Sequence, residues 1–304
     1  MITLATGLSY LDLKFQGVPN VIATALLHGP GGVALVDPGP SSALATLRTT
    51  LSDAGLAMSD VTEVLLTHIH LDHAGVSGTL VRENPRLRVY VHEKGAPHLI
   101  NPEKLLASAT RLYGEAMGRL WGEVRPVAPE ALVVLKGGER IEAGGRALQV
   151  EYTPGHASHH VSYFSRDAGV AFVGDTAGIH VVPDGYVLPP TPPPDIDLEA
   201  WRESLARIDR WGADTLFLTH FGPSSPVAPH LTALADHLEL TGGLVRASLM
   251  REGSDEAREQ WFADKIRGEL RRRMNEADAQ AYEIAGRFDL NWRGLARYWR
   301  KRSH

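Results

Sequence analysis

The chain has 304 residues, of which 43% are hydrophobic and 22% charged, and its formal net charge at pH 7 is -5. This composition is typical of a folded globular protein and argues against extensive disorder. The charge is modest for the length, so the chain as a whole has no strong electrostatic attraction to nucleic acid or anionic lipid.

The absence of cysteine excludes several kinds of site. Because the chain has none, it contains no disulfide, thiolate nucleophile, iron-sulfur ligand or thiolate zinc site. A metal site would need histidine, aspartate or glutamate. The N-terminus lacks a basic segment followed by an apolar run, and no stretch approaches the roughly 20 apolar residues of a membrane span. We therefore expect a cytoplasmic protein that does not enter the membrane.

Short strands and helices alternate in the first part of the chain. Apolar, β-branched runs bounded by glycine and proline predict strands, and a serine before a run of helix formers predicts a helix start. The predicted strands span residues 21–29, 31–40, 61–67 and 87–93, and the predicted helices span residues 41–56 and 75–84.

The middle of the chain interrupts this alternation. Residues 96–124 suggest one or two inserted helices, with apolar positions at Leu105, Leu112, Tyr113, Met117, Leu120 and Trp121. Strand-like runs resume at residues 132–155, 160–165, 169–175 and 214–220, and glycine-rich turns in the first of them indicate hairpins. We therefore predict a mixed α/β domain over residues 1–225.

Two later segments have a different composition. Residues 180–198 are too rich in proline for a central strand or helix and predict an ordered loop near the site. Strand signals end near residue 226, and the runs at 229–250, 254–274 and 291–302 predict helices. We therefore predict a helical C-terminal appendage over residues 226–304.

The sequence LLTHIHLDHAG, at residues 65–75, places three histidines and an aspartate directly after a predicted buried strand. If that strand continues through His68 and His70, its alternation points both imidazoles to one side. Asp72 and His73 follow where the chain turns into a helix, and they could face a second ion. Because imidazole and carboxylate are common metal ligands, the cluster indicates a metal site.

Three further candidate ligands each follow a predicted strand. They are His156 in VEYTPGH, Asp175 in VAFVGD and His220 in LFLTH. Strand ends at one edge of a sheet would bring all seven candidate ligands together. A carboxylate such as Asp175 can bridge two cations, and a two-metal site of this kind suits hydrolysis.

These residues resemble the motifs of the metallo-β-lactamase superfamily in its dinuclear hydrolase form, similar to glyoxalase II, over about residues 20–222. The resemblance implies a four-layer αββα sandwich and two divalent metal ions, with zinc expected and iron or manganese as alternatives. It assigns one metal to His68, His70 and His156 and the other to Asp72, His73 and His220, with Asp175 as the bridge.

Several sequence features distinguish this chain from particular branches of the family and disfavour the activities of those branches. Asp37, in LVDPGP, matches an acid that supports the metal-binding loops. Antibiotic-degrading members are typically exported, and several of their classes have a cysteine at the bridging position, so lactam hydrolysis is disfavoured. Flavodiiron relatives carry glutamate at the position of His70, so this chain differs from them. Nucleic-acid-processing relatives carry a large insertion or arm, and the sequence shows no such feature. The helical tail is similar in layout to that of glyoxalase II, but no motif in it identifies glutathione recognition.

The predicted function is hydrolysis of a thioester, lactone or phosphoester by metal-activated hydroxide, which Asp72 or Asp175 orients. We expect a small-molecule substrate, no nucleic acid or membrane partner, and a chain that could form a homodimer. The same ligands accept iron, so one alternative is a non-haem iron oxidoreductase acting on a sulfur substrate. Another is a binding or regulatory protein.

For several residues, two interpretations of the sequence remain open. His159 and His160 could line the pocket or lie on a strand face, and Tyr186 could donate a hydrogen bond to an oxyanion or simply pack its ring. The apolar positions of residues 96–124 could be core or could cover the substrate. The arginines at 271–273 and the RYWRKR ending could contact phosphates or form solvated helix faces. We expect substrate choice to depend on residues 180–195 and the tail, or otherwise on the insertion.

Overall fold

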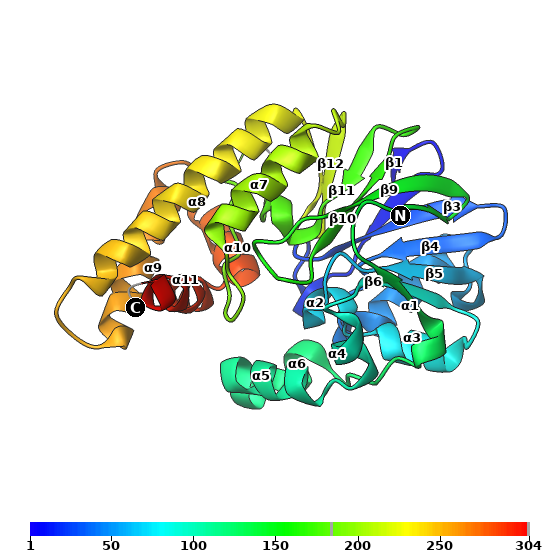
Figure 1. Cartoon of the computed structure of the whole chain (residues 1–304), viewed down its shortest axis with the longest axis horizontal. Helices are drawn as coiled ribbons and strands as arrows, with labels where there is room; N and C mark the ends of the chain where they lie inside the picture. Colours follow the sequence, from blue (N-terminus) through cyan, green and yellow to red (C-terminus); the bar gives the residue numbers. More distant parts are fainter. Residues whose placement is uncertain (183–184, 303–304) are drawn as a thin grey trace.

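The computed structural model describes residues 1–182 and 185–302 and consists of two β-sheets packed face to face, with helices on both outer faces (Figure 1). Each sheet therefore has an inner face against its partner and an outer face covered by helices. This arrangement confirms the predicted αββα sandwich and the helical C-terminal region.

The first sheet has the strand order β1-β2-β3-β4-β5-β6-β7, with β1 to β4 antiparallel and β4 to β7 parallel. Its strands are β1 (Ile2–Ala5), β2 (Leu8–Asp12), β3 (Ala23–Gly29), β4 (Gly32–Val36), β5 (Val61–Leu65), β6 (Arg88–His92) and β7 (Leu132–Leu135). β1 and β2 were not among the predicted strands. β1 pairs with β2, and β2 pairs with β3, and no local pattern reveals these pairings.

The second sheet has the order β13-β12-β11-β10-β9-β8 and is antiparallel except for the pair β11 and β12. Its strands are β8 (Arg140–Ala143), β9 (Arg146–Tyr152), β10 (Val161–Ser165), β11 (Val170–Phe172), β12 (Thr215–Leu218) and β13 (Gly222–Ser224). Of the hairpins predicted within residues 132–155, β8 and β9 form one, whereas β7 and β8 do not pair, because the chain passes there from the first sheet to the second.

Three clusters of buried apolar side chains fill the spaces between the layers. Leu65 and Phe172 belong to the cluster between the sheets. On the outer face of the first sheet, Val64 shares a cluster with Leu47 of α1 (Leu44–Asp53). The outer face of the second sheet, including Leu216, packs against α7 (Leu198–Asp209) and α8 (Val227–Leu249). Burial of these faces drives the stacking of the layers.

The other helices lie around the first sheet and in the C-terminal region. Near the first sheet are α2 (Leu71–Ala74), α3 (Ser77–Glu83), α4 (Ala96–Ile100), α5 (Glu103–Tyr113) and α6 (Met117–Trp121). The C-terminal helices after α8 are α9 (Asp255–Arg271), α10 (Glu276–Gly286) and α11 (Phe288–Arg302). The predicted insertion at residues 96–124 thus forms α4 to α6, and Figure 1 shows α5 and α6 apart from the sheets.

The C-terminal helices pack on the second sheet and on the proline-rich loop. Phe262 of α9 shares its cluster with Leu205 of α7. The Asn291 side chain accepts a hydrogen bond from the Thr191 backbone N–H at 2.8 Å, and the Thr191 hydroxyl donates to the Asn291 carbonyl at 3.2 Å. The tail therefore holds the Thr191 part of the loop in place, whereas residues 183–184 of the predicted ordered segment lie outside the described residues. The division of the chain into domains at residue 225 stays a prediction.

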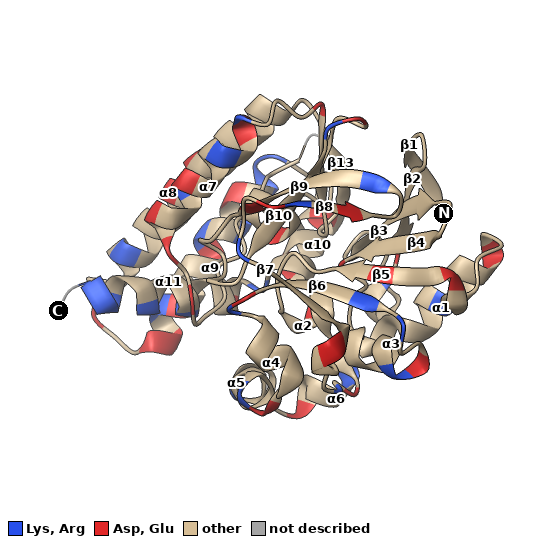
Figure 2. Ribbon diagram, turned by 45° about the vertical axis from the view of Figure 1, so that its right-hand side comes forward, with Lys and Arg blue, Asp and Glu red and all other residues tan. Residues whose placement is uncertain are grey.

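Charged residues of both signs intermingle over the C-terminal helices (Figure 2). Arg271 pairs with Glu276, and Arg272 and Arg273 both pair with Glu269. A cation that already faces a carboxylate has less attraction left for phosphate. These contacts favour the interpretation of this arginine run as a solvated helix face.

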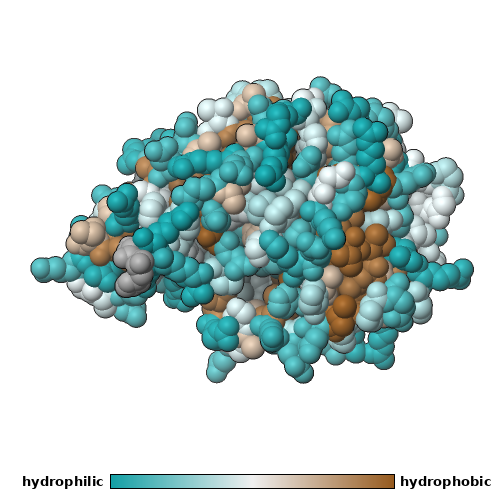
Figure 3. Space-filling view, in the orientation of Figure 1, coloured by the Kyte–Doolittle hydropathy of each residue, from teal (hydrophilic) through white to brown (hydrophobic). Residues whose placement is uncertain are grey.

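The outer surface is mostly hydrophilic on the face shown in Figure 3, with an apolar patch over part of the first sheet. Val134, in the edge strand β7, has 51% of its surface exposed. Among the helices of the described residues, none combines the length and apolar character needed to cross a membrane.

A substitution of Gly294, in α11, would test how tightly the tail packs on the proline-rich loop. A Cβ atom there would lie 2.0 Å from the Thr191 carbonyl oxygen. We expect Gly294→Ala to lower the free energy of unfolding by about 1–3 kcal/mol, because overpacking outweighs the gain in helix propensity. Thermal and urea unfolding would measure the change.

Gly243→Ala is the matched control, because Gly243 lies in α8 and has no atom within 4 Å of the added Cβ position. It should raise stability by about 0.5–1 kcal/mol. Equal effects of the two substitutions would show that the contact between α11 and the loop is not tight.

Candidate metal centre

The histidine cluster lies in the turn between β5 and α2. The strand ends at Leu65, so the condition that it continues through His68 and His70 is not met. The two imidazoles converge through the conformation of the turn instead of through strand alternation. Asp72 and His73 lie in the single turn of α2 that follows.

The three more distant residues also come from strand ends. His156 lies in the loop between β9 and β10, and Asp175 lies in the 3-10 helix η6 (Gly174–Ala177) directly after β11. His220 lies in the turn between β12 and β13. Because these ends meet at one edge of the sandwich, the seven residues gather as two groups, which are His68, His70, His156 and Asp175, and Asp72, His73 and His220.

In the first group, three imidazole nitrogens face a common point. His70 Nδ1 lies 2.9 Å from His68 Nε2 and 2.9 Å from His156 Nε2. Because neutral His156 donates its Nδ1 proton to the Pro190 carbonyl, its Nε2 carries a lone pair, and one proton on His70 Nδ1 can form a well-aligned hydrogen bond with only one of its two neighbours. The third nitrogen then has a lone pair that is poorly satisfied, which is a repulsive arrangement. A cation at the centre of the three nitrogens would remove this repulsion.

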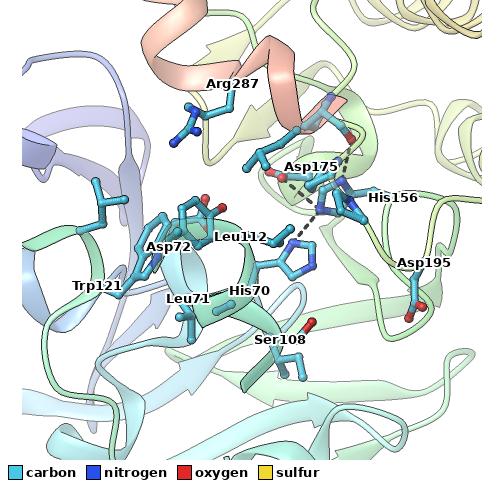
Figure 4. A pocket seen from close by; sticks show the side chains of 18 of the residues that line it. His70, Leu71, Asp72, Ser108, Leu112, Trp121, His156, Asp175, Asp195 and Arg287 are labelled. Carbon is cyan, nitrogen blue, oxygen red and sulfur yellow. Dashed lines mark hydrogen bonds and ion pairs between the residues drawn. The ribbon is translucent and has the colours of Figure 1, made fainter. Parts of the chain in front are cut away.

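Asp175 connects the two groups. Its Oδ2 lies 3.3 Å from His156 Nε2, whereas its Oδ1 lies 3.2 Å from His73 Nε2 and 3.5 Å from His220 Nε2. Asp72 Oδ2 lies 3.4 Å from His220 Nε2 on the far side of the second group. Figure 4 shows His70, Asp72, His156 and Asp175 directed toward one cavity.

Two buried atoms, one in each group, lack a hydrogen-bond partner among the described residues: His73 Nε2 and Asp175 Oδ1. A buried polar atom without a partner is costly unless an ion or water satisfies it. Imidazole nitrogen and carboxylate oxygen are the ligand atoms that zinc and similar cations prefer. The donor set therefore fits divalent metal ions in both groups.

The opposite ring nitrogens are held by the protein. His73 Nδ1 donates to Asp37 Oδ2 at 2.8 Å, His156 Nδ1 to the Pro190 carbonyl at 2.8 Å, and His220 Nδ1 to the Val21 carbonyl at 2.6 Å. A proton fixed on Nδ1 leaves the lone pair on Nε2, which faces the centre. The rings are therefore oriented before any cation binds.

Asp37 is completely buried and organises this support. Besides the proton of His73, its carboxylate accepts hydrogen bonds from the Thr67 backbone N–H at 2.8 Å, the Thr67 hydroxyl at 2.7 Å and the Thr219 hydroxyl at 2.8 Å. The structure thus places Asp37 directly behind the metal-binding loops, in agreement with the sequence analysis.

Burial and the neighbouring charges set the protonation states. Burial, and then the neighbouring imidazoles, lower the pKa of His68 well below its usual value and that of His70 to about 4. Burial opposes ionisation of Asp72, but the charges of His73 and His220 lower its pKa to about 2. Burial opposes the charge of His73 and His220 as well, but Asp175 and Asp72 raise the pKa of both imidazoles, that of His73 well above its usual value. His68 and His70 are therefore neutral, the form in which imidazole binds a metal, whereas a metal at the second group would displace a proton from His73 and His220.

Of the two adjacent histidines left open, only His159 lines the cavity. The His160 Nδ1 instead lies 3.0 Å from the Thr153 hydroxyl and 3.1 Å from the Thr176 hydroxyl, inside the fold.

Tyr186 does not line the cavity. It is 1% exposed, and its ring stacks on His237 with centroids 3.7 Å apart. The interpretation of Tyr186 as an oxyanion donor is therefore wrong, and the alternative, a packed ring, holds. The proline-rich loop contributes Pro190 and Pro192 to Asp195 instead.

The cavity beside the two groups has a volume of about 290 Å³. The inserted helices line one side of it through Leu112, Tyr113, Leu120 and Trp121. Arg287, at the junction of α10 and α11, also lines it, and the sequence analysis did not identify this residue. A motif could not have revealed it, because only the packing of the tail brings it to the site.

Comparison with known proteins agrees with this geometry. The family model of the metallo-beta-lactamase superfamily matches residues 17–220. A metallo-beta-lactamase fold-containing protein, ST1585 of Sulfurisphaera tokodaii, is 28% identical over 211 residues, which cover 68% of this chain and 76% of that protein. A hydroxyacylglutathione hydrolase of Synechococcus is 29% identical over 153 residues, covering 50% of this chain and 47% of the hydrolase. The match thus spans about half the length of such hydrolases.

Solved structures share the fold over nearly the whole chain. The metallo-beta-lactamase family protein TTHA1429 of Thermus thermophilus superposes with a TM-score of 0.73 at 26% identity, covering 99% of this chain and 95% of that one. The crystal structure of ST1585 has a TM-score of 0.63 at 22% identity, covering 95% and 98%. Together with the matched family model, these similarities confirm the resemblance seen in the motifs: the chain belongs to the metallo-beta-lactamase superfamily.

Proposed function

We propose that this protein is a hydrolase that uses two divalent metal ions to cleave an ester-like bond. The observation that carries the proposal is the position of Asp175, whose two oxygens face different groups of candidate ligands. A carboxylate placed between two cations offsets part of their mutual repulsion and supports a paired site. The hydroxyacylglutathione hydrolases among the relatives are consistent with this class of activity.

The residues that would hold the ions follow from the two groups. His68, His70 and His156 would hold one ion and Asp72, His73 and His220 the other, with Asp175 shared. When bound, such a pair polarises a carbonyl or phosphoryl oxygen and lowers the pKa of a shared water toward about 7. Zinc is the expected metal, and the same ligand atoms also suit iron or manganese.

Asp72 and Asp175 have different positions relative to the cavity. The Asp72 side chain is 25% exposed, whereas that of Asp175 is 5% exposed. Asp72 can accept a hydrogen bond from the attacking water and carry its proton toward the leaving group. Asp175, enclosed by imidazoles, holds the two groups at a fixed separation. Cytoplasmic location and a homodimer stay predictions.

Hydrolysis is tested with metal-analysed protein and a panel of one thioester, one lactone and one phosphodiester. We expect turnover of at least one substrate, lost on chelation and restored by added metal. Oxygen consumption with a persulfide substrate, combined with no turnover of the panel, would instead support the iron oxidoreductase alternative and contradict hydrolysis.

Removal of Asp175 tests the paired site. The parent protein should carry about two metal ions per chain, and Asp175→Ala should lower this to about one or fewer, because adjacent cations would then repel each other without a bridging charge. Elemental analysis measures the metal content, and circular dichroism confirms that the variant is folded.

Asp195→Ala is the control, because Asp195 lines the same cavity but belongs to neither candidate metal group. It should keep the parent's metal content. Full metal content in Asp175→Ala would show that this residue is not the bridge.

The hydrogen bond that His73 donates to Asp37 leads to a separate prediction. Asp37→Asn places an amide where four donors need an acceptor, so we expect the apparent metal affinity to fall about 10–100-fold. Competition with a chromophoric chelator would measure it. Asp12→Asn is a matched control, since Asp12 also accepts backbone N–H groups, from Lys14 and Asn20, at an exposed site. Similar affinities in all three proteins would exclude a role for Asp37 in orienting His73.

A further inference from the structure

We propose that the substrate is a carboxylic ester or thioester with an apolar acyl chain, which packs against α5 and α6, and with a polar leaving group on the opposite side of the cavity. This inference rests on the proposed hydrolysis and specifies the substrate class of the same site. It depends on the composition of the cavity walls and not on the metal-binding residues, which suit many substrates.

The apolar wall is built from aromatic and aliphatic side chains outside the main core. Leu71, Ala109 and Trp121 form a small cluster of their own, against which Leu105, Tyr113 and Leu120 pack. Trp121 stacks on Phe15 with ring centroids 5.6 Å apart and contacts Tyr113 edge-on at 5.0 Å. Such contacts hold the rings in place. Side chains of this wall also line the cavity, so the wall offers a preformed apolar surface beside Asp72.

A second apolar surface comes from the C-terminal helices. Ile284 lines the cavity while 45% of its surface is exposed, and Leu290 lines it from α11. A methylene chain placed against Leu112 and Ile284 would remove apolar surface from water, which is favourable. The tail and the insertion thus provide apolar surface from two separate parts of the chain.

The opposite side of the cavity is polar. Lys94, Ser158 and Asp195 line the cavity and also a neighbouring one of about 410 Å³. The Ser158 hydroxyl donates to Asp195 at 2.7 Å, and the Lys94 ammonium donates to the Tyr152 hydroxyl at 2.7 Å. In Figure 4, Trp121 and Asp195 lie on opposite sides of His70 and His156. A substrate with one apolar and one polar end matches this arrangement.

The cations of the cavity do not favour a phosphodiester. Arg287 already forms two hydrogen bonds with Asp289, at 3.0 and 2.7 Å. Lys94 and Lys104 are exposed at the rim, and Asp195 lies on the same side as Lys94. Metal ions at the two groups would attract a phosphate as they would a carbonyl oxygen, but the side chains of the apolar wall carry no charge to replace the hydration of a phosphodiester anion. A neutral ester or thioester avoids this cost.

The test uses S-acyl derivatives of N-acetylcysteamine, a small polar thiol, with acyl chains from two to ten carbons. We expect kcat/KM to rise roughly fourfold per added methylene over the first several carbons, as expected for a methylene moved from water into an apolar site. S-octyl thioacetate, which carries its apolar chain on the leaving group, should react at least tenfold more slowly than the octanoyl derivative.

Variants of α5 test whether the preference for longer acyl chains arises from the apolar wall. Leu112→Ala should lower the ratio of octanoyl to acetyl turnover about tenfold. Leu106→Ala is the control, because Leu106 lies in the same helix and packs against the cluster of the apolar wall but is not among the residues that line the cavity. It should keep the parent's ratio. Calorimetry with hexanoate, octanoate and decanoate provides a readout without turnover, and affinity should increase with chain length in the parent and less in Leu112→Ala.

The outcomes separate this inference from the proposed function. Turnover of all acyl chains at equal efficiency, or faster turnover of S-octyl thioacetate, would overturn the inference and leave hydrolysis intact. If no ester, thioester or phosphodiester is cleaved by metal-loaded protein, the proposed function fails, and the calorimetric series then decides whether the wall binds apolar chains. Equal affinity for all three alkanoates would overturn the inference.

Discussion

The hydrogen bonds of the Asp37 carboxylate are the interaction on which the rest of the site depends. Asp37 follows β4 of the first sheet, and it accepts hydrogen bonds from Thr67 after β5 and from Thr219 after β12 of the second sheet. It also accepts the Nδ1 proton of His73. One buried carboxylate thus joins the ends of strands from both sheets to the turn that carries the histidine cluster. Loss of any one of these donors would leave part of a buried charge unpaired.

The same principle orients His156 and His220, because each uses Nδ1 for a hydrogen bond with the protein and leaves Nε2 for the centre. The backbone carbonyls of Pro190 and Val21 receive the Nδ1 protons of His156 and His220. These carbonyls belong to segments far from the histidines in the sequence, so the fold must form before the ligands are oriented. Because the ligand side chains are already held in position, they lose less conformational entropy when a metal binds.

The metal-binding residues and the cavity walls come from different parts of the fold. The ligands lie at strand ends of the sandwich, whereas the walls come from α5, α6 and the junction of α10 and α11. Contacts such as the hydrogen bond between Thr191 and Asn291 connect the tail to the loop that holds His156. Chemistry and substrate selection can therefore change separately: the sandwich keeps the reactive groups, and the added helices shape the space around them.

The sequence by itself determined the features that depend on local patterns. Apolar runs predicted most strands, and the motif from His68 to His73 with His156, Asp175 and His220 identified the family and the residues that the structure brings together. Tertiary structure alone decided the features that depend on distant partners. β13, with the sequence Gly-Pro-Ser, is a strand only because it pairs with β12, and Tyr186 is removed from the cavity by stacking on His237. Arg287 reaches the cavity through the packing of the tail. Local periodicity records which residues prefer burial, but the three-dimensional packing of segments far apart in the chain decides which surfaces they share.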